Sequence, residues 1–156
     1  MRRYVVLTAL LLLVFGLLAG PAAAVGGRTF TLTLSGDVGP EPGGDPDGSG
    51  TARISVNPGT QTVCFDIAVQ DIAEPVEPGP GIGSVHIHFG SVTEIGGIAV
   101  DPEADFEPTE DGFAASGCAE DVDRGLLVDI LMNPENFYLN IHNVEFPGGA
   151  LRAQLA

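Results

Sequence analysis

The chain has 156 residues, a formal net charge of −15, and neither lysine nor tryptophan. Such an acidic surface repels the phosphates of nucleic acids and of anionic membranes, so both are excluded as partners of the mature protein. The length suits one domain with a modest core, and no repeat or second domain is visible.

The first residues have the composition of an export signal. Two arginines precede an apolar run over residues 4–18, and three alanines at 22–24 provide a cleavage site. We therefore expect residues 1–24 to be a signal peptide and residues 25–156 to form the mature domain, secreted, periplasmic or at the cell surface. The alternative is a retained membrane anchor, since this segment is barely long enough to span a bilayer.

Cys64 and Cys118 are the only two cysteines. In an oxidising compartment a disulfide between them is the simplest interpretation, and it would close a loop of about 55 residues. Two free thiols or two thiolate metal ligands remain the alternative.

The first half of the mature chain alternates between polar and apolar residues. Residues 28–35, 51–56 and 62–70 are predicted strands with one buried face each. A Pro-Gly turn at 57–60 joins the second and third, with the glycine expected to take a positive φ. The Gly- and Pro-rich segment 36–50 is predicted to be a loop. It weakly resembles a calcium-binding loop, but it lacks the ligand spacing and the terminal glutamate of an EF-hand.

All three histidines fall in two further alternating segments, 84–90 and 137–143. In the first, Val85, Ile87 and Phe89 are expected to face the core, with His86 and His88 on the other face. In the second, the apolar face carries Phe137, Leu139 and Ile141, and the polar face carries Tyr138, Asn140 and His142.

The remaining segments complete an all-β pattern. Residues 98–100, 112–118 and 150–155 are predicted strands, and 101–111 is an acidic loop. One short helix is expected after Asp123, ended by Asn133-Pro134, and it either covers an open end of the fold or presents a ridge to a partner. Many short strands with glycine- and proline-rich connections predict an antiparallel β-sandwich or barrel.

Several of these pieces together resemble the CHRD domain, the module named from chordin. The matching pieces, in order, are Phe30–Gly36, Gly50–Ala52, Val85–His88, Phe137–Asn143 and Phe146–Leu155. The resemblance covers nearly all of the mature chain and implies an immunoglobulin-like β-sandwich or barrel without an established enzymatic activity. The family's Asn-Gly-Pro loop after the histidine strand is replaced here by Glu94-Ile95-Gly96-Gly97.

Two hypotheses compete for the histidines. His86, His88 and His142 could bind copper or zinc if their strands are neighbours, with Asp66 or Glu145 adding an oxygen ligand. Alternatively, the imidazoles form a structural hydrogen-bond network with loop carbonyls and Asn140. Arg152 and Gln154, on the polar face of the last strand, are expected to support this face by capping carbonyls or pairing with Asp66 or Glu145.

Catalysis has little support in the sequence. Ser84, His86 and Asp66 have the residue types of a hydrolytic triad, but the Gly-x-Ser-x-Gly motif is missing. We therefore expect an exported, non-catalytic CHRD domain that acts as a binding or structural module for an unknown extracellular protein or ligand. The alternative is a histidine-based copper or zinc protein.

Overall fold

The computed structural model describes residues 26–40, 42–77, 83–102 and 104–156. The expected signal peptide, residues 1–24, lies outside these ranges. Among the described residues, no helix combines the length and apolarity needed to cross a membrane.

Nine strands form one antiparallel sheet in the order β5-β4-β8-β9-β1-β2-β3-β7-β6, which confirms the all-β prediction. The elements, in chain order, are β1 (Arg28–Ser35), β2 (Ser49–Asn57), β3 (Thr62–Gln70), β4 (Val85–Phe89), β5 (Ile98–Val100), β6 (Glu107–Pro108), β7 (Phe113–Ala119), α1 (Arg124–Met132), the 3-10 helix η1 (Pro134–Asn136), β8 (Phe137–Ile141) and β9 (Leu151–Gln154).

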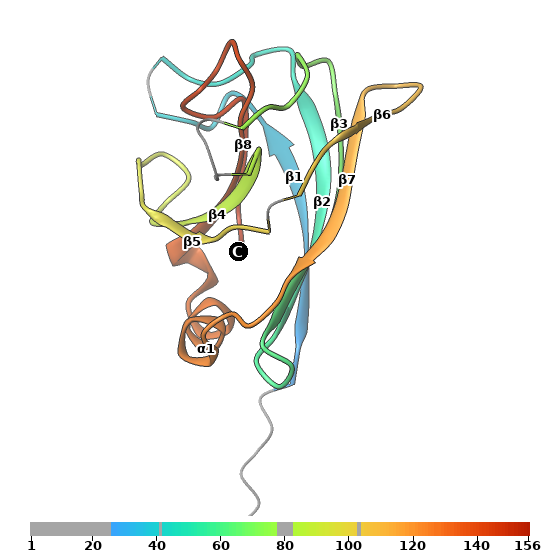
Figure 1. Cartoon of the computed structure of the whole chain (residues 1–156). Helices are drawn as coiled ribbons and strands as arrows, with labels where there is room; N and C mark the ends of the chain where they lie inside the picture. Colours follow the sequence, from blue (N-terminus) through green and yellow to red (C-terminus); the bar gives the residue numbers. More distant parts are fainter. Residues whose placement is uncertain (1–25, 41, 78–82, 103) are drawn as a thin grey trace, which may run out of the picture.

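The sheet is continuous, but it is divided into two halves by a narrow junction. One half contains β5, β4, β8 and β9, and the other contains β1, β2, β3, β7 and β6. Their junction is narrow, because β1 and β9 share only the register pair Ser35–Arg152. The sheet therefore curls, and the two halves lie opposite one another like the layers of a sandwich (Figure 1).

The hydrophobic core lies between these halves. Alternate residues of β1, β2 and β3 point inward, and their burial follows the predicted period of two. Val85 and Ile87 of β4 and Leu139 and Ile141 of β8 are fully buried in the same core. The strand predictions at 28–35, 62–70 and 98–100 are confirmed to the residue.

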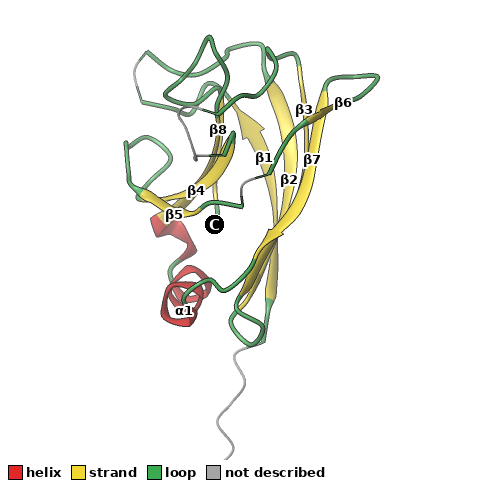
Figure 2. Ribbon diagram, in the orientation of Figure 1, coloured by secondary structure: helices red, strands yellow, loops and turns green. Residues whose placement is uncertain are grey.

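The short helix also forms as predicted. The Asp123 carboxylate accepts a hydrogen bond from the backbone N–H of Leu126 at 2.9 Å, which caps the first turn. Leu127 and Ile130 are fully buried in the core. The helix therefore packs over one end of the fold, below β4 and β5 in the ribbon view (Figure 2).

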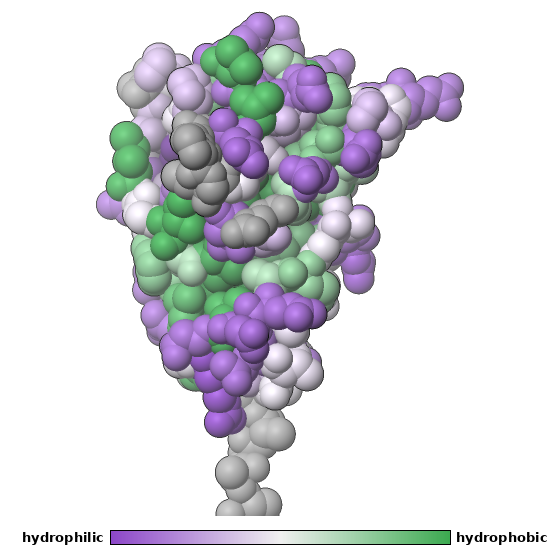
Figure 3. Space-filling model, viewed as in Figure 1, coloured by the Kyte–Doolittle hydropathy of each residue, from purple (hydrophilic) through white to green (hydrophobic). Residues whose placement is uncertain are grey.

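One turn and one loop of the predicted pattern differ from the structure. Gln61, rather than Gly59, has the positive φ (57°) in the turn between β2 and β3. The two-residue strand β6, within the segment expected to be a loop, pairs with β7. The turn that joins β6 to β7 projects from the molecule and is hydrophilic, with Thr109, Glu110 and Asp111 exposed (Figure 3).

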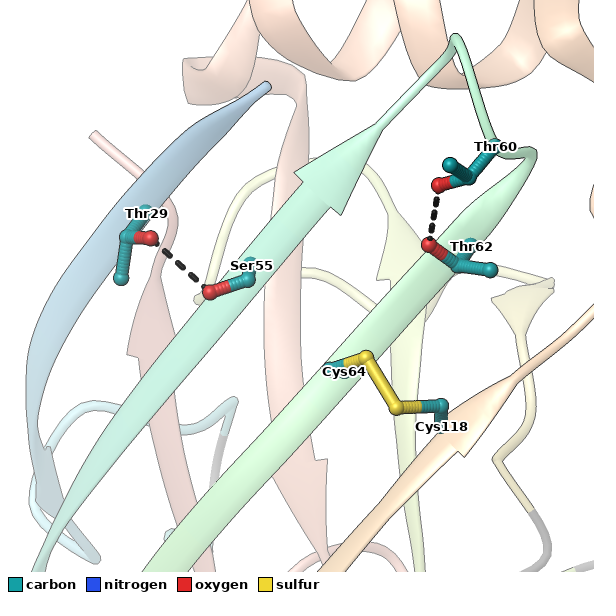
Figure 4. The surroundings of a disulfide bond; sticks show 6 residues. All are labelled: Thr29, Ser55, Thr60, Thr62, Cys64 and Cys118. Atoms are coloured by element: carbon teal, nitrogen blue, oxygen red, sulfur yellow. Dashed lines mark hydrogen bonds between the residues drawn. A yellow bond between two sulfur atoms is a disulfide. The ribbon is translucent and has the colours of Figure 1, made fainter.

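Cys64 and Cys118 form the predicted disulfide. The two residues are direct register partners in β3 and β7, so the bond joins adjacent strands on the outer face of the sheet (Figure 4). Cys118 is exposed, and the same face carries hydroxyl pairs such as Thr29 with Ser55, 2.8 Å apart. The disulfide therefore links β3 to β7 on the outer face of the sheet, away from the core.

We predict that the double variant Cys64→Ser/Cys118→Ser folds with a free energy of unfolding lower by about 2–4 kcal/mol, because the unfolded chain loses the constraint of a long closed loop. Urea denaturation at neutral pH measures this difference. Ser116→Ala, an exposed change on the same strand, is the control and should alter stability by less than about 0.5 kcal/mol. Equal stability of the oxidised wild type and the double variant would contradict the prediction.

Candidate functional site

Polar side chains of β4, β8 and β9 share one face of the sheet, the face turned away from the core. The strand register places them in two cross-strand rows. The first row contains His86, Asn140 and Arg152, and the second contains His88, Tyr138 and Gln154. We call this set, together with His142, the polar cluster.

The polar cluster is buried, although the sequence predicted strands with one solvated face. His86 is 1%, Asn140 1% and Arg152 4% exposed. Both faces of β4 and β8 are therefore covered, and only the last residue of β4 departs from this pattern. Phe89, predicted to be in the core, is 44% exposed, because it ends the strand where the chain turns at Gly90.

Two loops cover the cluster, one at residues 90–97 and one at 143–150. Arg152 holds both, since its Nη1 donates to the carbonyls of Val92 and Glu94 and its Nη2 donates to that of Gly148. Gln154 adds a bond from its Nε2 to the carbonyl of Phe137 at 2.6 Å. Both side chains thus bind loop and strand-end carbonyls, one of the two arrangements that the sequence suggested.

The three histidines converge beneath these loops. The ring centroids of His86 and His142 are 4.7 Å apart, and those of His86 and His88 are 5.0 Å apart. One nitrogen atom from each ring can be chosen so that all three lie within 4.8 Å of one another. The histidine strands are therefore neighbours, which was the condition that the sequence set for a shared site.

Backbone carbonyls fix the tautomers of two rings. His88 Nδ1 lies 2.8 Å from the carbonyl oxygen of Gly96, and His142 Nδ1 lies 2.8 Å from that of Pro147. A carbonyl only accepts, so both Nδ1 atoms carry the proton and both Nε2 atoms carry a lone pair. One of these carbonyls, that of Gly96, lies in the segment 94–97, where the sequence departs from its resemblance to the CHRD domain.

The lone pairs at Nε2 are used within the cluster. His86 Nδ1 lies 3.0 Å from His88 Nε2, and Asn140 Nδ2 lies 3.1 Å from His142 Nε2. The first bond requires a proton on His86 Nδ1, which leaves its Nε2 as a bare lone pair. Among the described residues this buried atom has no hydrogen-bond partner.

The environment favours neutral imidazoles. Burial, and then the nearby rings of His142 and His88, lower the pKa of His86 to about 4, although Asp101 and the Gly83 backbone act in the opposite direction. Burial is also the main reason why the pKa values of His88 and His142 are lowered. Neutral imidazole is the form that binds a metal ion.

Tyr138 contacts both His88 and the buried guanidinium of Arg152. Its ring stacks on that of His88 at 5.0 Å, and the guanidinium carbon of Arg152 lies 4.9 Å from its centroid. Its hydroxyl accepts a hydrogen bond from the backbone N–H of Gly96 at 3.2 Å. The alternating pattern placed Tyr138 on the polar face without indicating a role in the site, although its spacing from Asn140 and His142 was a usable signal.

Other candidate residues do not join the cluster. Asp66 lies on the exposed face of β3, in the opposite half of the sheet, where its register partners are Arg53 and Ser116. Ser84 Oγ donates to the carbonyl of Ala104. A triad of Ser84, His86 and Asp66 is thus not assembled, and the described cluster of possible metal ligands contains histidines alone.

The sequence profile of the CHRD domain matches residues 30–155. This chain belongs to the CHRD family. The match includes both histidine strands and the last strand with Arg152, so the polar cluster lies within the CHRD domain. No curated protein and no solved structure matches the chain.

We predict that acidification destabilises the metal-free CHRD domain. His86 has a pKa of about 4 in the folded protein, against 6.5 for the unfolded chain, so the unfolded state binds more protons between these values. The stabilisation is complete above about pH 7 and is lost as the pH falls from about 6.5 toward 4, by about 2–3 kcal/mol. Urea denaturation at a series of pH values, in 0.5 M salt to screen the acidic surface, measures the change.

The variant His86→Gln tests the assignment to this residue. It should show a flatter dependence of unfolding free energy on pH between 7 and 5 than the wild type. Identical pH dependence in the two proteins would show that His86 is not the titrating group.

Proposed function

We propose that this protein is an exported, non-catalytic CHRD domain that binds a transition-metal ion, copper or zinc, through His86, His88 and His142. The observation that carries the proposal is the fixed orientation of two imidazoles. Their Nδ1–H groups donate to backbone carbonyls, so that two Nε2 lone pairs point into the cluster. Ligand histidines in metal sites usually have this outer hydrogen bond, which fixes the tautomer and the ring orientation.

Binding would exchange hydrogen bonds for metal bonds. His88 Nε2 and His142 Nε2 would release the N–H groups of His86 and Asn140 and bind the ion instead. His86 would then coordinate through Nδ1, the nitrogen that faces His88 Nε2, with its proton moved to Nε2. Metal–nitrogen bonds of about 2.0–2.1 Å require the widest nitrogen pair to close by on the order of 1 Å.

The donor set suits copper or zinc. Neutral imidazole binds both metals, whereas calcium and magnesium prefer oxygen ligands. Arg152 disfavours positive charge on His88 and His142, and Asp101 favours it on His86. The charge of Arg152 therefore lowers the affinity for a divalent ion and is less unfavourable for monovalent copper, whereas Asp101 acts in the opposite direction.

Export and the absence of catalysis are parts of the same proposal. The disulfide is consistent with an oxidising compartment, and the first 24 residues have signal-peptide features. The separation of Asp66 from Ser84 and His86 also supports a non-catalytic role, because these three side chains do not form a triad. A binding role fits three neutral imidazoles whose rings are held by hydrogen bonds to carbonyls and to one another.

We predict that untagged protein binds one copper or zinc ion per chain. Metal content after dialysis, measured by mass spectrometry, gives the stoichiometry, and competition with a chelator gives the affinity. His88→Gln and His142→Gln should each weaken binding at least 100-fold, since each removes one of three ligands. Divalent copper bound at the site should also show nitrogen coupling in its paramagnetic resonance spectrum.

Asp66→Asn is the matched control, because it removes an acidic side chain outside the cluster and should leave metal binding unchanged. Folding of each variant is checked by near-ultraviolet circular dichroism. If folded wild-type protein binds no stoichiometric metal, or if the histidine variants bind it equally well, the cluster is a structural hydrogen-bond network alone.

A further inference from the structure

Asn140 places an amide group at the edge of the proposed metal site. Its Nδ2 lies 3.1 Å from His142 Nε2, one of the proposed ligand atoms. Two ligand atoms of a tetrahedral zinc ion are about 3.3 Å apart, because each lies about 2.0–2.1 Å from the metal. The amide therefore occupies the position of a fourth ligand, and the atom that it presents there determines whether the site has three ligands or four.

Asn140 presents its nitrogen rather than its oxygen to the site. The hydrogen-bond network orients an amide group, since the nitrogen only donates and the oxygen only accepts. Nδ2 donates to the carbonyl of Gly148 at 3.3 Å as well as to His142. Oδ1 lies beside Arg152, because Oδ1 and Arg152 Nε are the two polar atoms nearest to the position of a Cβ at Gly149. The group that faces the metal position is thus an N–H donor, which cannot bind a cation.

This orientation remains favoured when an ion replaces the hydrogen bond between Asn140 and His142. Rotating the amide by 180° would place Oδ1 against the Gly148 carbonyl oxygen and Nδ2 against the Nε–H of Arg152. Both contacts would join groups of like polarity inside the protein, where Asn140 is 1% and Arg152 4% exposed. Such contacts are costly at this degree of burial. The oxygen of Asn140 is therefore withheld from the metal.

The rest of the cluster supplies no anionic ligand. Among the described residues, the group that could hold an ion here contains His86, His88 and His142 alone. Asp101 favours positive charge on His86, but its Oδ2 accepts a hydrogen bond from the Gly83 backbone N–H at 3.0 Å. Arg152 disfavours positive charge on the other two rings. The site therefore consists of three neutral nitrogen donors close to a buried cation.

We infer that Asn140 limits the site to three histidine ligands and thereby makes it selective for monovalent copper over zinc. The inference rests on the proposed metal site and names its ion. Monovalent copper is stable with two or three nitrogen ligands and adds one positive charge. Zinc requires a fourth ligand and adds two positive charges. Asn140 thus determines specificity by occupying the fourth position without offering a ligand atom.

The variant Asn140→Asp tests this role. It keeps the shape of the side chain, places a carboxylate oxygen beside His142 Nε2 and gives Arg152 an anionic neighbour. It should raise the affinity for zinc by about 100-fold and shift the ratio of the two affinities toward zinc by at least about tenfold. Competition with chromophoric chelators measures both affinities in the untagged protein, with ascorbate and without oxygen for monovalent copper.

Asn57→Asp is the matched control, because it adds the same charge outside the cluster. Asn57 lies in the turn between β2 and β3, where its Oδ1 accepts hydrogen bonds from the N–H groups of Gly59 and Thr60. Aspartate retains both bonds, so this variant should bind both metals as the wild type does. An equal gain in zinc affinity in the two variants would assign the effect to added charge and overturn the role of Asn140.

Measurements on the wild type keep the inference testable if Asn140→Asp does not fold. X-ray absorption at the copper edge, with one monovalent ion per chain, should show three nitrogen ligands. Protein given equimolar zinc and monovalent copper should retain copper alone after gel filtration. A fourth nitrogen or oxygen ligand, or zinc retained in equal amount, would overturn the inference and leave the metal proposal intact. Absence of any bound metal would overturn both.

Discussion

The structure depends on one constraint, the burial of a polar sheet face. Each unsatisfied donor or acceptor there would cost about 1–3 kcal/mol, so the histidine strands can be covered only if the covering loops supply partners. They do so in part with backbone carbonyls: those of Gly96 and Pro147 accept hydrogen bonds from imidazoles, and that of Gly148 accepts one from the Arg152 guanidinium. Some buried polar atoms, His86 Nε2 among them, have no partner among the described residues. The histidine tautomers and the positions of the two loops are therefore determined together, and the candidate site is inseparable from the fold.

The two halves of the sheet differ in burial and in how they are stabilised. The half containing β1, β2, β3 and β7 has one dry face and one exposed face, and its outer surface is fastened by the disulfide. The half containing β4, β8 and β9 is buried on both faces and carries every histidine of the chain. Only one register pair joins the halves, and the disulfide lies within the first half, so the second half is held by packing and hydrogen bonds.

Period-two alternation was sufficient to predict most of the strands and the face on which each histidine lies. It could not show that the polar face is covered, because the covering loops 90–97 and 143–150 have no periodic pattern and act through backbone carbonyls, which every residue possesses. For the same reason the burial of Arg152 and the stacking of Tyr138 on His88 were not predictable. Phe89 was misplaced because alternation assumes that the strand continues, and here the strand ends at that residue.

Arg152 both supports and opposes the proposed metal site. Its guanidinium holds the two covering loops in place, and these loops supply the carbonyls that fix the tautomers of His88 and His142. Its charge also disfavours positive charge on the same two rings. The side chain that helps to orient two of the imidazole ligands therefore also opposes the cation that they would bind.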